Sequence, residues 1–287
     1  MSTNIHKTGV TRRRDYSAGV SESIGFILLF SIVMAGIGLV TLYGYPLLLE
    51  QQRNTDIQIM ENNMIVLQND IKSLAFKTVP YTETSMRISS GTLAVYNRSY
   101  QYPSTSIVIR DCGGSPTYLS QYNPGELRYE SISGDRDISL QTGAVIERNY
   151  IEGGSAMIAE PRWFYDQITN TMVINLISIN STRLSRSGIG TVGMKYGELA
   201  QTNFTQFKFV AGTDPNVCLE LTPNSTYDYS LAWDTYVQGQ PSPNMIRQAG
   251  GLPNNHVMVK YKLPIKSVAT IPATLVIRQT DVTVSSL

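Results

Sequence analysis

The chain begins with a long stretch of apolar residues that carries no charge. No Asp, Glu, Lys or Arg occurs from Ser23 to Leu49, a run of 27 residues. About 20 apolar residues suffice to cross a bilayer as a helix, and apolar helices inside globular cores are usually shorter than this run. We therefore predict a transmembrane helix over residues 20–49. Pro46 lies near its far end, where membrane helices tolerate a kink.

A second pattern follows the apolar run and has the period of an amphipathic helix. Apolar side chains recur at spacings of three and four residues, with Gln, Asn, Asp, Glu and Lys between them. This stripe consists of Ile57, Met60, Met64, Leu67, Ile71 and Leu74. The pattern predicts a helical stalk over residues 50–79 that ends near Lys77, before Pro80. The stripe either packs against the protein's own domain or forms a coiled coil. It spans fewer heptads than a sustained coiled coil, so we favour packing against the domain.

From residue 80 to the C-terminus the helical period is replaced by short segments typical of β-strands, separated by Gly, Pro, Asn and Asp. The predicted strands are Ser85–Ser89, Thr92–Tyr96, Ser106–Arg110, Glu126–Ile132, Ile138–Leu140, Ala144–Arg148, Ala156–Glu160, Met172–Ile179, Phe204–Val210, Val217–Leu221, Val257–Leu263, Leu275–Ile277 and Val282–Val284. One segment, Tyr229–Val237, is predicted to be a short helix. The fold class is therefore α+β, with a mostly antiparallel β-sandwich-like or open-barrel domain over residues 80–287.

Charge and composition indicate where the chain resides. Charged residues make up only 16% of the sequence and the formal net charge is +1, which gives no electrostatic reason to expect a nucleic-acid partner. Positive charge is concentrated before the apolar run, at Lys7 and at residues 12–14. By the positive-inside rule, residues 1–19 form a cytoplasmic leader and the C-terminal domain lies outside the cell. We thus expect a single-pass protein of the cell membrane.

Two further features agree with an exterior domain. Cys112 and Cys218 are the only cysteines, and in an oxidising space they form either a disulfide or two separate buried thiols, of which we favour the disulfide. Candidate glycosylation sites of the type N-x-S/T occur at Asn97, Asn180, Asn203 and Asn224.

The residues before the apolar run resemble the processing region of archaeal type IV pilin precursors. This region reads Ala18-Gly19-Val20-Ser21-Glu22-Ser23-Ile24-Gly25-Phe26. The longer phrase GVSESIGFILLF…GIGLVTLYGYPLLLEQQ is also similar to the N-terminus of archaeal pilin-like surface proteins without an assigned function. The resemblance is clear over residues 18–52. It implies that a prepilin peptidase cuts between Gly19 and Val20, and that the retained helix packs with other pilin-like subunits.

Four residues of the helix are candidates for assembly. The Glu22 carboxylate is favoured at a helix N-terminus, where Ser21 or Ser23 caps the helix. In a filament Glu22 would lie near the N-terminal amine of a neighbouring subunit. Ser31, Ala35 and Gly38 share one helix face. Small residues in this arrangement let membrane helices approach closely, although membrane helices also contain such residues for no special reason.

The search for catalytic chemistry finds no nucleophile elbow, zinc-protease motif or phosphate loop. Asp135 and Asp137 flank Arg136 in a D-x-D pattern, which is a weak signal for calcium. We therefore expect no enzyme activity, no metal and no cofactor. The favoured function is a membrane-anchored pilin-like protein that assembles into or primes a type IV pilus-like surface filament, with adhesion as one outcome. The alternative is a single-pass membrane protein that does not polymerise and whose ectodomain binds a ligand or a cell-wall component.

Overall fold

The computed structural model describes residues 17–77, 79–100, 103–182, 185–197, 203–239, 244–248, 250–253, 255–266 and 271–287. The chain divides into two compact units, Met1–Asn54 and Thr55–Leu287. We describe each unit by itself.

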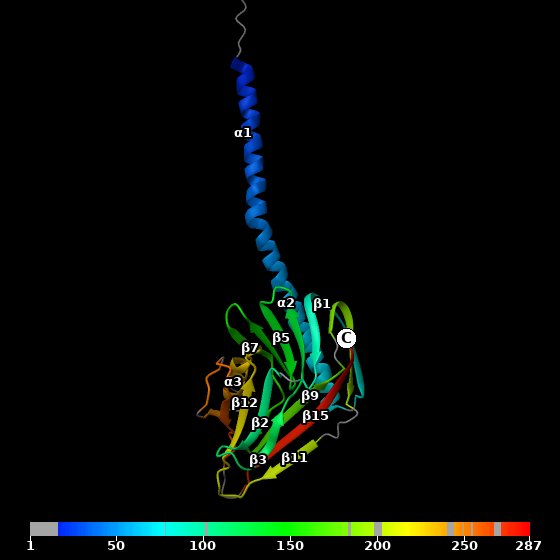
Figure 1. The fold of residues 1–287 in the computed structure, drawn as a ribbon, viewed down its shortest axis with the longest axis vertical. Helices are drawn as coiled ribbons and strands as arrows, with labels where there is room; N and C mark the ends of the chain where they lie inside the picture. Colours follow the sequence, from blue (N-terminus) through cyan, green and yellow to red (C-terminus); the bar gives the residue numbers. More distant parts are fainter. Residues whose placement is uncertain are drawn as a thin grey trace, which may run out of the picture. The chain divides into compact units, whose positions relative to one another are not determined.

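The first unit is helical throughout its described part. Helix α1 (Ser17–Leu39), shown in dark blue in Figure 1, is followed by a π-helical turn, η1 (Val40–Gly44), and by the beginning of helix α2 (Tyr45–Phe76). Within η1 the N–H of Tyr45 donates to the carbonyl oxygen of Val40, five residues earlier. Pro46 explains this widened turn, because proline has no N–H for the carbonyl four residues before it and its ring crowds that carbonyl. The region from Glu22 to Phe76 is long and apolar enough to contain a membrane span, judged by length and composition.

The second unit contains a large sheet of ten strands and a small sheet of five. The large sheet consists of β1 (Tyr81–Tyr96), β4 (Glu126–Ser131), β5 (Arg136–Gln141), β6 (Ala144–Asn149), β7 (Gly154–Ala159), β8 (Phe164–Asp166), β9 (Thr171–Asn180), β10 (Ser185–Tyr196), β11 (Asn203–Lys208) and β15 (Thr274–Ser286). The small sheet consists of β2 (Thr105–Asp111), β3 (Thr117–Tyr122), β12 (Val217–Pro223), β13 (Ile246–Arg247) and β14 (Val259–Lys262). One short helix, α3 (Ser230–Gln238), lies in this unit where the sequence predicted one.

The order of strands in the large sheet is β7-β6-β5-β4-β1-β10-β15-β9-β8, with β11 also paired to β15. Neighbouring strands run antiparallel except β9 and β15, which are parallel. In Figure 1 the red strand β15 runs beside β9. The predicted α+β class, with an apolar helix followed by a mostly antiparallel β domain, is confirmed.

Each face of the large sheet carries a hydrophobic core. Side chains alternate along each strand, so Leu275 and Ile277 of β15 face one core whereas Val282 and Val284 face the other. The first core is shared with the small sheet and α3. The second core is shared with helix α2.

The apolar stripe of α2 packs against the protein's own domain, as favoured from the sequence. All six of its members are at most 5% exposed and belong to the core shared with the large sheet. The helix ends at Phe76, close to the predicted end at Lys77. The residues from Thr55 onward belong to the same compact unit as the strands.

Several strands differ from the prediction. The segments Ser85–Ser89 and Thr92–Tyr96 are parts of the single strand β1, whose pairing with β10 shifts between Ile88 and Leu93. The last two predicted strands are likewise one strand, β15. Strands β3, β8, β10 and β13 were not predicted.

Candidate functional site

The side chains of the apolar helix in the first unit lie on its surface and are not buried in a core. Every residue from Glu22 to Tyr43 is exposed, including Phe26 at 70% and Val40 at 70%. Contiguous apolar patches on soluble monomers rarely exceed a few hundred Å². The surface of this helix is therefore compatible with lipid or other helices around it.

The predicted small-residue stripe lies on this exposed surface. An added Cβ at Gly38 would meet no atom within 4 Å, so packing within the chain does not require a glycine there. The hydroxyl of Ser31 has a partner within its own helix, because its Oγ donates to the carbonyl oxygen of Ile27 at 2.7 Å. Ala35 is exposed as well. Larger side chains are thus compatible with the fold at Ala35 and Gly38.

The predicted processing site lies at the start of α1. Residues 1–16, which contain the basic leader, lie outside the described residues. Gly19 and Val20 fall within the first turn of α1, which begins at Ser17. Glu22 therefore lies in the second turn of the full-length chain, and the predicted cap at Ser21 or Ser23 is wrong there. Cleavage after Gly19 would instead leave Glu22 as the third residue of the mature chain.

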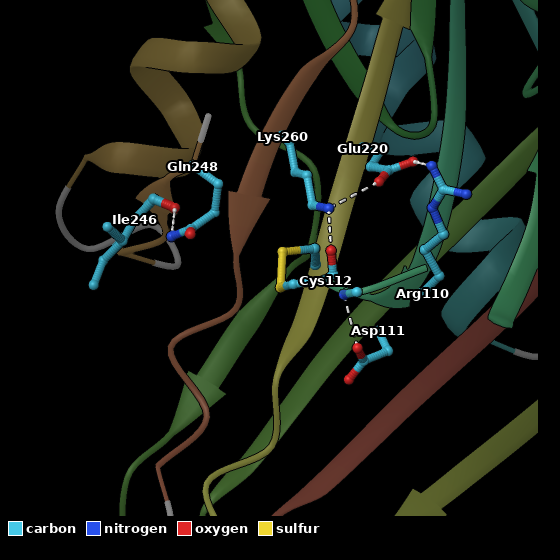
Figure 2. Close-up of a disulfide and its surroundings, with 9 residues drawn as sticks. Arg110, Asp111, Cys112, Glu220, Ile246, Gln248 and Lys260 are labelled. Carbon is cyan, nitrogen blue, oxygen red and sulfur yellow. Dashed lines mark hydrogen bonds and ion pairs between the residues drawn. A yellow bond between two sulfur atoms is a disulfide. The ribbon is translucent and has the colours of Figure 1, made fainter. Parts of the chain in front are cut away.

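Cys112 and Cys218 form a disulfide, which confirms the favoured alternative. Cys218 lies on β12, opposite Arg110 of β2, and Cys112 follows β2 directly, so strand pairing brings the two Cα atoms to 5.0 Å. Figure 2 shows the ion pairs that surround this link. The Glu220 carboxylate lies 2.7 Å from Arg110 and 3.5 Å from Lys260. Lys260 Nζ also donates to the carbonyl oxygen of Cys112 at 2.5 Å.

The four candidate glycosylation asparagines are all at least partly exposed. Asn203 begins strand β11 and is exposed. Asn97 and Asn224 lie in turns, where their Oδ1 atoms accept backbone N–H groups two residues later, from Ser99 and Thr226. Asn180 is the last residue of β9. None of these residues is buried, although the Nδ2 of Asn97 donates to the carbonyl oxygen of Ser181 at 3.3 Å.

A buried polar cluster centred on Arg128 was not found from the sequence. The guanidinium of Arg128 is about 1% exposed and lies between the rings of Tyr96 and Tyr227, 4.2 and 3.4 Å from their centroids. It pairs with Glu126 and lies 3.2 Å from Glu130. Burial disfavours the charge of Arg128, but Glu126, Tyr229 and Tyr96 together outweigh burial, so the pKa of Arg128 is raised. The sequence signal for this cluster is the alternation Glu126-x-Arg128-x-Glu130, which places three charged side chains on one face of a strand.

This cluster satisfies its own charges. The second oxygen of Glu126 accepts hydrogen bonds from Ser104 at 2.8 Å and Ser139 at 2.5 Å. Glu130 additionally accepts the hydroxyl of Tyr227 at 3.1 Å. The cluster therefore ties strands β4 and β5 to loops and is best understood as a structural network.

The D-x-D pattern does not form one site. Asp135 accepts hydrogen bonds from Ser131 and Ser133 in the turn before β5. Asp137 is 1% exposed and accepts the hydroxyls of Tyr150 and Tyr229. The two carboxylates thus have separate partners, and no group of three or more metal-ligating side chains occurs among the described residues.

The comparisons with known proteins give one match. A family model described as a family of unknown function (DUF7289) matches residues 18–250. No curated protein and no solved structure matches the chain. The match begins in the predicted processing region and extends through most of the β domain.

Proposed function

The chain belongs to this family of unknown function, and we propose that it is a membrane-anchored pilin-like protein. In this proposal a prepilin peptidase removes residues 1–19, and the mature protein assembles into, or primes, a type IV pilus-like filament on the cell surface. The β domain lies outside the cell and the helix of the first unit packs with helices of other subunits.

The exposure of the apolar helix is the observation that carries the proposal. Residues 22–43 are exposed without exception, whereas the stripe of α2 is already buried on its own sheet. The stripe of α2 is therefore not available as a coiled-coil seam, whereas the apolar side chains of residues 22–43 are available for association. Its small residues at Ser31, Ala35 and Gly38 favour close contact between helices.

The predicted topology receives support from the second unit. The disulfide between Cys112 and Cys218 is of the kind that persists in oxidising spaces outside the cytoplasm. The candidate glycosylation sites are partly or fully exposed in the same unit. Both features agree with an extracellular β domain.

The alternative function is that of a simple anchor. Lipid alone satisfies an exposed apolar helix of this length, so the same exposure also supports a single-pass protein that does not polymerise. The two functions differ in one chemical event, because only the pilin-like function requires removal of the leader.

Mass spectrometry of the N-terminus of native protein, isolated from its own cell membrane, tests the proposal. We expect the mature chain to begin at Val20. A Gly19→Leu variant should retain the leader and fail to assemble. A Gly25→Ala variant is the matched control, since an added Cβ there meets no atom within 4 Å, and it should be processed like the parent. Native protein that still begins near Met1 would contradict the pilin-like function.

A further inference from the structure

A groove opens on the α2-bearing face of the large sheet, next to the C-terminal end of that helix. Its volume is about 450 Å³, within the range of small-molecule sites. Two adjacent rungs of the sheet form its floor. In the first rung Phe204 of β11, Arg278 of β15 and Asn175 of β9 are directly paired. In the second rung Val276 of β15, Val173 of β9 and Phe164 of β8 are paired in the same way.

Two arginines bring positive charge to this groove. The guanidinium carbons of Arg162 and Arg278 lie 4.9 and 5.1 Å from the ring centre of the same residue, Phe76. Among the described residues, no carboxylate lines the groove and neither arginine forms an ion pair with a carboxylate. Arg278 donates to the carbonyl oxygen of Ala75 at 2.7 Å, while its buried Nε has no hydrogen-bond partner.

The positive charge affects the neighbouring lysine. Burial, followed by the charge of Arg162, lowers the pKa of Lys72, and Glu160 only partly opposes this effect. The ammonium of Lys72 donates to the backbone carbonyl of Glu160 at 3.2 Å. Three cationic side chains therefore gather around the end of α2.

A structural role accounts for part of this arrangement. Cations are favourable at a helix C-terminus, and Arg278 contacts a carbonyl of the last turn of α2. This role does not account for Arg162, which is exposed, or for the exposed rings of Phe164 and Phe204, 44% and 60% accessible. An anion and an apolar surface together would satisfy all of these groups.

We propose that the groove binds an acidic sugar residue, a hexuronate of a polysaccharide. The carboxylate pairs with Arg162, which is the more exposed of the two arginines, and Arg278 adds positive charge to the groove. The sugar ring lies on the exposed rings of Phe164 and Phe204. Arginine suits this task because its planar fork of donors matches a carboxylate. A sugar chain suits the groove because it is open to solvent, so that one residue binds while the rest of the chain continues over the surface. Binding at this site does not depend on leader removal or on assembly.

Calorimetric titration of the full chain in uncharged detergent micelles tests the proposal. The probe is a tetramer of galacturonate, and the comparison ligand is a neutral tetramer of galactose. We expect the acidic tetramer to bind at least tenfold more tightly. The Arg162→Gln variant should lose about tenfold in affinity, the loss typical of a charge-assisted hydrogen bond. Phe164→Leu should weaken binding of the acidic tetramer severalfold.

The Arg148→Gln variant is the matched control, because Arg148 also stacks on an aromatic ring, that of Tyr150 at 4.4 Å, outside the groove. It should bind like the parent. Absence of binding, or equal binding of the neutral tetramer, would overturn the proposal. Equal losses of affinity in Arg162→Gln and in the control Arg148→Gln would overturn it too. Inorganic sulfate that binds as tightly as the acidic tetramer would overturn it as well, since the groove would then be a simple anion site.

Discussion

At the scale of single residues, Asp137 links pH to the stability of the β domain. Burial raises its pKa to about 6, although hydrogen bonds from Tyr150 and Tyr229 and the charge of Arg128 oppose this effect. The folded protein therefore binds more protons than the unfolded chain between the ordinary value of 3.8 and about 6. The contribution of Asp137 to stability is complete below that window and is lost as the pH rises through it.

We predict that the parent loses stability relative to an Asp137→Asn variant as the pH rises. Between about pH 5 and pH 7 the difference in free energy of unfolding should change by about 1 kcal/mol, the size given by linkage for this shift. Urea denaturation at several pH values, followed by tryptophan fluorescence, measures the change.

Asp135→Asn is the control for this series. Burial raises the pKa of Asp135, but hydrogen bonds from Ser133 and Ser131 outweigh it, and the net pKa is lowered. Asp135 then titrates below about pH 5 in both the folded and the unfolded chain. The difference in free energy of unfolding between this variant and the parent should therefore stay constant from pH 5 to pH 7. A constant difference for Asp137→Asn as well would show that Asp137 remains ionised throughout this range.

At the scale of elements, the burial of the α2 stripe determines whether the helix is part of the domain. Leu67 is 0% exposed in the core that α2 shares with the large sheet, whereas its neighbour Val66 is 47% exposed. We predict that Leu67→Ala lowers the free energy of unfolding by roughly 3 kcal/mol. Val66→Ala should change it by less than about 0.5 kcal/mol.

Urea denaturation also measures the stability of the Leu67→Ala and Val66→Ala variants. Trp163 and Trp233 report from the opposite face of the sheet, in the core shared with the small sheet. If α2 is an integral part of a cooperative domain, their fluorescence should shift to lower urea in Leu67→Ala. An unchanged transition in that variant would mean that α2 separates from the sheet without affecting it.

The helices were predictable from the sequence because their signal is local and long. The uncharged run extends over several helical turns, and the three- and four-residue spacing from Ile57 to Leu74 recurs over several more. Strand β10 was missed because Gly188, Gly190 and Gly193 interrupt it, and glycine weakens a strand pattern. Gly193 lies against neighbours distant in sequence, since a Cβ there would lie 2.6 Å from Ser286 Oγ.

The candidate sites also differ in whether their signal is local in the sequence or arises from strand pairing. The processing region and the small-residue stripe occupy consecutive turns of one helix, so the sequence displays them directly. The disulfide could only be favoured, because the pairing of β2 with β12 fixes the distance between Cys112 and Cys218. The groove could not be predicted, since Phe204, Arg278 and Asn175 become neighbours only through the register of three strands.

At the scale of the whole molecule, the two units differ in how they satisfy their apolar surface. The second unit buries its apolar side chains in two cores on the two faces of the large sheet. The first unit leaves its large apolar residues exposed from Ile24 to Leu48. Neither core contains a residue of α1, so substitutions in α1 leave the packing of both cores unchanged.

We predict that the apolar helix is an element of assembly as well as an anchor. Ala35→Leu combined with Gly38→Leu should abolish filaments or oligomers, because bulky side chains prevent close contact along the stripe. Expression and membrane insertion should be unchanged, since both positions are exposed and a Cβ at Gly38 meets no atom within 4 Å. Val33→Leu combined with Val40→Leu, on the opposite face, is the control and should assemble normally. Electron microscopy of the cell surface and chemical cross-linking in membranes measure assembly. If both double variants assemble like the parent, the stripe plays no part in helix contact, and if neither they nor the parent assembles, the helix serves as an anchor only.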